Sequence, residues 1–191
     1  MNRAAVAAAA LTLAVVLPPS APAQDGFDLE QEIQLCAACH GQDGIPANPE
    51  YPILWGQEYF YLFTQLRDYA AGRRQNEIMT PIAAKYDRSA AKALAEHFAG
   101  LAWPKFQASA EDGDRRITER SASGGQFSAC HGIWNGNSNV PRLMGQQPGY
   151  LRKTMLDFKN EVRMNAPDTI STMQKLDDAT IEAMARYLST L

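Results

Sequence analysis

The chain contains two copies of one sequence pattern, and this internal repeat constrains the fold more than any other feature. Cys-His-Gly triplets begin at Cys39 and Cys130, and further matches continue to Asp87 and Asp177, with offsets of 89 to 91 residues. Between these points the first copy has Pro52, Leu54, Gly56, Gln57, Tyr61, Leu62, Leu66, Asp68 and Tyr69, and the second has Pro141, Leu143, Gly145, Gln146, Tyr150, Leu151, Met155, Asp157 and Phe158. Such a repeat indicates one folding unit used twice, so we expect two homologous modules of about 80 residues.

Each module has the spacing of amphipathic helices. Leu62, Leu66 and Tyr69 lie at i, i+4 and i+7, as do their counterparts, which places each trio on one helix face. Asp87 and Asp177 precede the last apolar periodic segment of each module, where a carboxylate can cap free backbone N–H groups. No segment alternates apolar and polar residues for long enough to indicate a strand. We therefore predict an all-α fold.

The chain begins with a segment typical of an export signal. Arg3 precedes an apolar run, and the small residues that end at Ala23 form a cleavage site. The run is short for a membrane-spanning helix, so we expect cleavage after about Ala23 and no membrane span in the mature protein. The predicted divisions are a signal peptide over 1–23, a first module over 24–104 and a second module over 105–191. The formal net charge is −3 and no basic cluster is present, which argues against a nucleic-acid partner.

The first module contains a short motif with metal-binding chemistry, in which Cys36, Cys39 and His40 form the pattern C-x-x-C-H. On one helical turn both sulfurs can reach the two vinyl groups of a porphyrin, while the imidazole points at the iron. This pattern is the attachment signature of c-type haem. A redox dithiol is disfavoured because no strand precedes Cys36. A zinc site is disfavoured because only three ligands are present.

His40 is the predicted proximal iron ligand, and Met79 is the predicted ligand on the far side. Met79 lies between Ile78 and the pair Thr80-Pro81, in an expected loop rather than on an apolar helix face, which disfavours a purely structural role. Methionine in the sixth position fills the iron coordination and raises the potential. A haem without an open position predicts outer-sphere electron transfer.

The order of these motifs resembles a known family. CAACHG is followed by a proline-bearing loop, GQ-x3-YL-x2-QLRDY-x2-GRR, a methionine and a capped last helix, and the order is repeated after a signal peptide. It resembles the dihaem cytochromes c4 and is similar to the dihaem subunit of flavocytochrome c sulfide dehydrogenase. The resemblance implies two tandem class I cytochrome c domains about a pseudo-twofold axis, in a bacterial periplasm, passing electrons to a terminal oxidase or another acceptor. It also implies thioether bonds at Cys36 and Cys39, and axial ligation by His40 and Met79.

The second module departs from this pattern at two positions. Phe127 stands where the first cysteine of the motif is expected, so Cys130 can form only one thioether bond, beside the candidate ligand His131. The position that matches Met79 falls on Asp168, Thr169 or Ile170. Because none of these is methionine, Met173 is the first candidate for the sixth ligand and Met164 is the second.

Three interpretations of the second module stay open. It holds haem through Cys130 and His131 with a sixth methionine ligand; it holds haem with an open far side that binds ligands or supports peroxidase chemistry; or it has lost haem and serves as a packing or docking partner. Tyr61 and Tyr150 are expected either at the contact between modules or against the porphyrin.

We predict an electron-transfer protein rather than an enzyme, with haem c in the first module and a second haem c in the other. Its partners are expected to be redox proteins, such as a terminal oxidase. The alternative is an electron-accepting cytochrome subunit bound to a dehydrogenase such as a flavoprotein.

Overall fold

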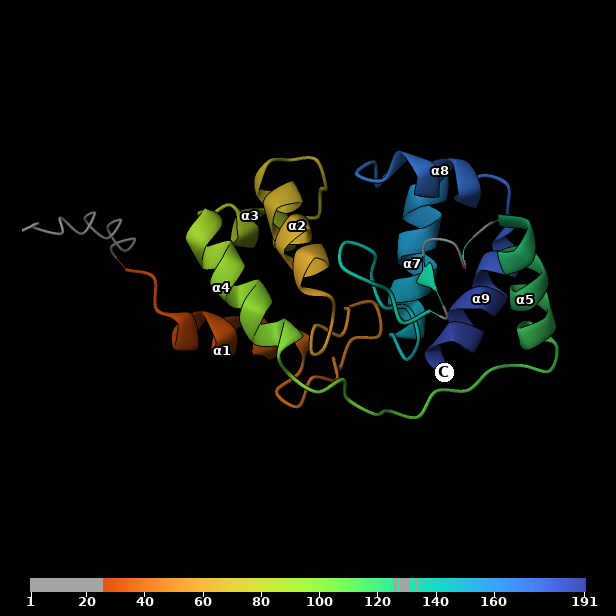
Figure 1. Cartoon of the computed structure of the whole chain (residues 1–191), viewed down its shortest axis with the longest axis horizontal. Helices are drawn as coiled ribbons and strands as arrows, with labels where there is room; N and C mark the ends of the chain where they lie inside the picture. The colour runs from red at the N-terminus through yellow and green to blue at the C-terminus, as the bar shows by residue number, and fades with distance from the viewer. Residues whose placement is uncertain (1–25, 126, 128–130, 133) are drawn as a thin grey trace, which may run out of the picture.

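The computed structural model describes residues 26–125, 127, 131–132 and 134–191. Within these ranges it contains eight helices and no strand, apart from an isolated bridge between Asn137 and Val140. Figure 1 shows two helical lobes joined by an extended segment that runs along one side of the molecule. The all-α prediction is confirmed. The signal peptide predicted over 1–23 lies outside the described residues, and none of the described helices is long and apolar enough to cross a membrane.

The first lobe is built around a pair of packed helices, α2 and α4. Its four helices are α1 (Leu29–His40), α2 (Tyr59–Ala70), α3 (Met79–Ala83) and α4 (Arg88–Ala99). Helix α4 packs on α1 and α2 and buries Leu94 and Phe98 against Leu62. Asp87 caps α4 as predicted, because its carboxylate accepts the Ala90 N–H at 2.7 Å.

The second lobe repeats this arrangement. Its four described helices are α5 (Asp114–Gly125), α7 (Pro148–Lys159), α8 (Pro167–Met173) and α9 (Asp178–Ser189). Helix α9 packs on α5 and α7, as α4 packs on α1 and α2. Asp177 caps α9 by accepting the Thr180 N–H at 2.7 Å. Buried Asp114 additionally fixes α5 to α9 through a salt bridge to Arg186 at 2.8 Å.

Two glutamines matched across the repeat hold the lobes together. The Gln146 amide accepts the Ile53 N–H at 2.8 Å and donates to the Ile53 carbonyl at 3.1 Å. The Gln57 amide accepts the Arg142 N–H at 2.8 Å and donates to the Arg142 carbonyl at 3.0 Å. Both glutamines are buried. These reciprocal contacts relate the two lobes by an approximate twofold axis.

Candidate haem site

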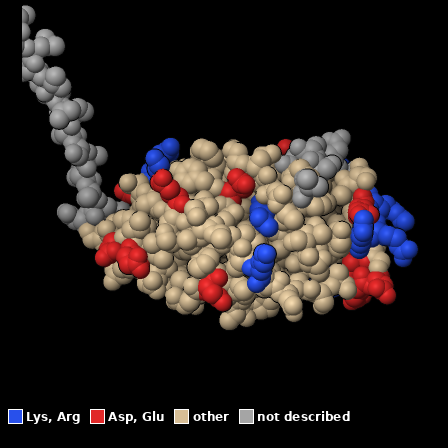
Figure 2. Space-filling view, turned by 60° about the horizontal axis from the view of Figure 1, so that its bottom comes forward, with Lys and Arg blue, Asp and Glu red and all other residues tan. Residues whose placement is uncertain are grey.

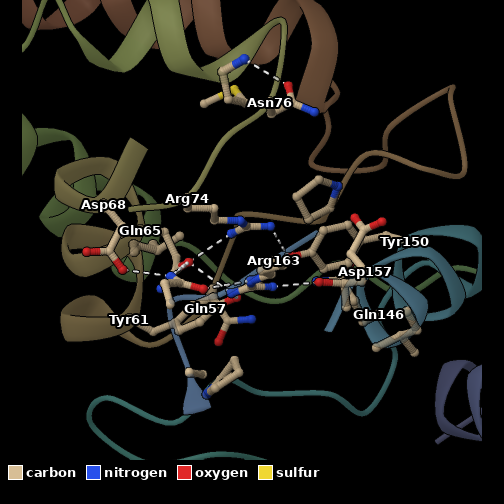
Figure 3. Close-up of a pocket in the computed structure, with 18 of the residues that line it drawn as sticks. Gln57, Tyr61, Gln65, Asp68, Arg74, Asn76, Gln146, Tyr150, Asp157 and Arg163 are labelled. Atoms are coloured by element: carbon tan, nitrogen blue, oxygen red, sulfur yellow. Dashed lines mark hydrogen bonds between the residues drawn. The ribbon is translucent and has the colours of Figure 1, made fainter. Parts of the chain in front are cut away.

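A cavity of about 770 Å³ is lined by both lobes. Its volume is typical of a site for a small molecule or cofactor. The predicted site residues among its lining are Cys36, Cys39, His40 and Met79 from the first lobe, and His131 and Met173 from the second. Cys130 lies outside the described residues. Figure 3 shows the polar side chains from both lobes that meet inside the cavity.

His40 is the last residue of α1, and the loop that follows fixes its imidazole. Its Nδ1 lies 2.8 Å from the Pro52 carbonyl oxygen, which can only accept, so Nδ1 carries the proton and Nε2 keeps its lone pair. Burial lowers the pKa of His40, which favours the neutral form that binds metals. Gly41 has φ of +93°, and a Cβ there would lie 2.4 Å from the Ile45 carbonyl oxygen. Only glycine therefore lets the chain turn so tightly after His40.

The two cysteines of α1 are not joined to each other in a disulfide. Cys36 is half-buried, and burial, followed by the charge of Glu32, raises the pKa of its thiol to about 11. A reactive dithiol requires a lowered thiol pKa, so this environment disfavours redox exchange. Among the described residues, no group of three or more His, Cys, Asp or Glu side chains is arranged to hold a metal ion. Cys36, Cys39 and His40 lie together on α1, an arrangement that fits covalent attachment of a porphyrin.

Met79 lines the same cavity as His40. The sequence predicted a loop here, and that prediction is wrong, since Met79 is the first residue of the short helix α3. The side chain of Asn76 explains the helix, because its Oδ1 accepts the N–H groups of Ile78 and Met79 at 3.0 and 2.9 Å. Pro81 is tolerated because it lies in the first turn, where no N–H is needed.

The second module presents a similar histidine beside a different neighbour. His131 Nδ1 lies 3.2 Å from the Pro141 carbonyl oxygen, and burial lowers its pKa. Phe127 occupies the place of the first cysteine and is buried, with its ring centroid 6.2 Å from that of Trp134. An aromatic contact therefore stands where the first module has a sulfur.

Helix α8 shows which residue replaces Met79. The backbone hydrogen bonds that close α3 and α8 repeat with an offset of 90 residues, so Thr169 matches Met79 and Met173 matches Ala83. Thr169 and Met173 are one helical turn apart, on the same face, and both line the cavity. The side chain of Met173 is 3% exposed, whereas Met164 is 60% exposed and does not line the cavity. The geometry therefore favours Met173 over Met164.

Two arginines of the cavity were not singled out from the sequence. Arg74 donates to the Tyr150 hydroxyl at 3.3 Å, and Arg163 donates to the Tyr61 hydroxyl at 3.3 Å (Figure 3). Tyr61 and Tyr150 thus lie at the contact between the lobes, one of the two places expected for them. The two arginines are 89 residues apart, so the repeat offset was the signal that would have identified them.

Comparisons with known proteins extend over both lobes. Cytochrome c4 of Thiocapsa roseopersicina is 31% identical over 173 residues, which cover 82% of this chain and 87% of that protein. A thiosulfate dehydrogenase electron acceptor of Stutzerimonas stutzeri is 28% identical, over 93% of this chain and 91% of that protein. Reduced cytochrome c4 from Pseudomonas stutzeri matches with a TM-score of 0.75 and 27% identity, over 85% and 96% of the two chains. No protein-family model matches the chain.

These similarities agree with the geometry. They span both modules, which confirms the prediction of two tandem class I cytochrome c domains. The relatives are named as cytochromes and as an electron acceptor, in agreement with electron transfer rather than catalysis. The chain belongs to the dihaem cytochrome c4 family of electron-transfer proteins, which carry haem c in two domains.

Proposed function

We propose that the protein is exported to the periplasm, loses residues 1–23 and carries electrons there. In the first module, which we assign to 24–104, Cys36 and Cys39 hold haem c covalently, and His40 and Met79 are its axial ligands. One observation carries this assignment: His40, with its Nδ1 proton committed to Pro52, lines the same cavity as Met79. Haem bound in this way supplies a reversible one-electron iron couple.

The residues of the first module suit outer-sphere transfer. Two protein ligands would leave no iron position for water or substrate. Buried Leu62, Leu94 and Phe98 form an apolar part of the cavity wall in this module. Ligands held by the helices α1 and α3 would let the iron change its charge with little rearrangement of the protein.

For the second module, assigned to 105–191, we propose attachment of haem c through Cys130 with His131 and Met173 as ligands. His131 has the same hydrogen-bond arrangement as His40, and Met173 faces the cavity from α8. Thr169 at the position of Met79 favours a second candidate, a haem with an open position that binds small ligands.

We propose redox proteins as partners, with a terminal oxidase as the acceptor. Figure 2 shows one face on which charged groups of both signs are scattered among uncharged atoms, which favours short-range contacts over long-range electrostatic attraction. The similarity to a thiosulfate dehydrogenase electron acceptor supports a second candidate, a cytochrome subunit that accepts electrons from a dehydrogenase. Stoichiometric co-purification with a dehydrogenase would favour that candidate.

A redox titration of the exported protein, followed by its visible spectrum, tests the proposal. We expect reversible one-electron steps and a low-spin spectrum that carbon monoxide does not change at the first haem. The absence of a reversible haem couple would overturn the assignment. A change in only part of the reduced spectrum on adding carbon monoxide would support an open second haem.

A further inference from the structure

The segment 100–113 connects the two lobes, and Figure 1 shows that it runs along one side of the molecule. Within this segment Trp103 is half-buried, and it does not line the cavity. The backbone of Trp103 lies against the first lobe and its side chain against the second, so one residue of the linker contacts both modules. Trp103 therefore lies outside the candidate haem site.

Two glycines matched across the repeat, Gly56 and Gly145, leave room for Trp103. A Cβ on Gly56 would lie 2.9 Å from the Trp103 backbone nitrogen, and a Cβ on Gly145 would lie 2.9 Å from Trp103 Nε1. Both glycines have positive φ, of +67° and +71°. Any other residue at either position would therefore strain the turn and displace Trp103.

Each of these glycines is fixed to the last helix of its own lobe. Gly56 donates its N–H to the Phe98 carbonyl of α4 at 2.8 Å, and Gly145 donates its N–H to the Leu188 carbonyl of α9 at 2.9 Å. The two surfaces that enclose Trp103 thus belong to the lobes rather than to the linker. Trp103 can keep both contacts only while the lobes stay docked.

The indole also contacts a residue that joins the lobes. The Arg142 guanidinium lies 4.4 Å from the centre of the Trp103 ring, and the Arg142 backbone is paired with Gln57 of the first lobe. The Trp103 Nε1–H is buried and has no hydrogen-bond partner among the described residues. A buried N–H without an acceptor is unfavourable, so the shape of the ring and its contact with Arg142 hold the indole in place, rather than a hydrogen bond.

We propose that Trp103 is a latch that holds the two modules in their docked arrangement. Removal of its ring leaves an empty space between the linker and Gly145 and takes away the surface on which Arg142 rests. The docked arrangement fixes the distance between the redox sites of the two modules. Trp103 is then a positioning residue for electron exchange between the haems, a consequence that rests on the proposed function, whereas the latch itself depends only on protein groups.

Amide hydrogen exchange of the intact haem-loaded protein tests the latch. The N–H groups of Ile53 and Arg142, the docking amides, donate across the contact between the lobes, so their exchange reports undocking. The N–H groups of Leu94 and Met184 lie inside α4 and α9, so their exchange reports unfolding of a module. We expect Trp103→Ala to accelerate exchange of the docking amides about tenfold and to leave the rates of the other two within about twofold of wild type.

Gly145→Ala tests the same contact from the second lobe. It should accelerate exchange of both docking amides, because the new Cβ displaces the indole. The matched control is Gly72→Ala, since Gly72 also has φ of +71° but a Cβ there would meet no atom within 4 Å. This control measures the backbone strain alone and should leave exchange of the docking amides nearly unchanged.

Two further variants separate the latch from a general loss of packing. In the double variant Trp103→Ala/Gly145→Ala, exchange of the docking amides should be no faster than in Trp103→Ala, because the ring that the new Cβ displaces is already absent. Trp103→Phe keeps a ring beneath Arg142 and lacks the N–H, so its docking amides should exchange more slowly than those of Trp103→Ala. Equal rates in Trp103→Phe and Trp103→Ala would contradict a latch formed by the ring.

Unchanged exchange of the docking amides in Trp103→Ala would overturn the latch, as would an equal acceleration at Leu94 and Met184. If Trp103→Ala does not fold, the comparison of Gly145→Ala with Gly72→Ala decides, and equal exchange in these two variants would overturn the latch. A wild type without a reversible haem couple would refute the proposed function and not the latch, because the amide rates are measured without a redox couple.

Discussion

The two modules share a scaffold and differ at the positions that would hold the haem. Matched glutamines, tyrosines and arginines connect the lobes by reciprocal hydrogen bonds. Around the candidate iron sites the matches fail, because Phe127 replaces Cys36 and Thr169 replaces Met79. The contact between modules requires both partners of each pair, whereas each ligand set serves one module. A change in one ligand set therefore leaves the contact between the modules intact.

The largest effects are expected from the candidate sixth ligands. Met79→Ala should remove the low-spin histidine–methionine spectrum of the first haem and lower its potential, since methionine ligation raises it. Met173→Ala should do the same to the second haem only. Visible spectra and redox titration of both variants measure this, with exposed Met164→Ala as the control.

If Met173 serves only the core, Met173→Ala should leave both haem spectra unchanged. It would then cost only stability, about 2–5 kcal/mol for a buried methionine. That result would show that methionine is not the sixth ligand in both modules, and it would leave the sixth position of the second haem iron without a protein ligand.

Phe127→Cys should make the second module more like the first. The new cysteine completes C-x-x-C-H with Cys130 and His131, so we expect a second thioether bond and a haemochrome spectrum shifted towards that of a doubly attached haem. Phe127→Ser is the control, because it removes the buried ring without supplying a sulfur. Identical spectra in the two variants would show that the second module cannot attach haem at this position.

A smaller effect should distinguish the two glutamine contacts. Gln146→Ala leaves the backbone N–H and carbonyl of Ile53 unpaired at a residue that is 1% exposed, so it should cost about 3 kcal/mol. Gln57→Ala exposes the same groups of half-buried Arg142 to water and should cost about 1 kcal/mol. Urea unfolding measures both, with exposed Gln174→Ala as the control. Equal losses would contradict the role of burial.

The smallest expected effect tests what the modules share. Asp87→Ala and Asp177→Ala each remove one capping hydrogen bond of 2.7 Å, so each should cost about 1 kcal/mol. Thermal unfolding of the two variants should therefore shift by similar amounts. A difference of 2 kcal/mol or more would show that one cap has a further role.

The sequence predicted what local pattern and repetition determine. The helix spacing of Leu62, Leu66 and Tyr69 gave the correct face of α2, and the caps at Asp87 and Asp177 are present. From the sequence, the residue that matches Met79 could be narrowed only to Asp168, Thr169 or Ile170. The second module has one extra residue before α8, and only the backbone hydrogen bonds show which of the three is the match.

The arginine pair could not be predicted from either module alone. Arg74 and Arg163 are distant in sequence, and their common acceptor Gln65 belongs to only one lobe. Their proximity depends on how the lobes dock, which helix periodicity does not specify. A charged pair at matched repeat positions was the only sign of it in the sequence.

The mass of the intact exported protein, together with a haem count by pyridine haemochrome, tests the central claim most directly. We predict the chain from about Gln24 plus two haems, one attached by two thioether bonds in the first module and one attached by a single bond in the second. A mass with one haem, located on the peptide of Cys36 and Cys39, would contradict the two-haem account and leave the second module as a docking domain.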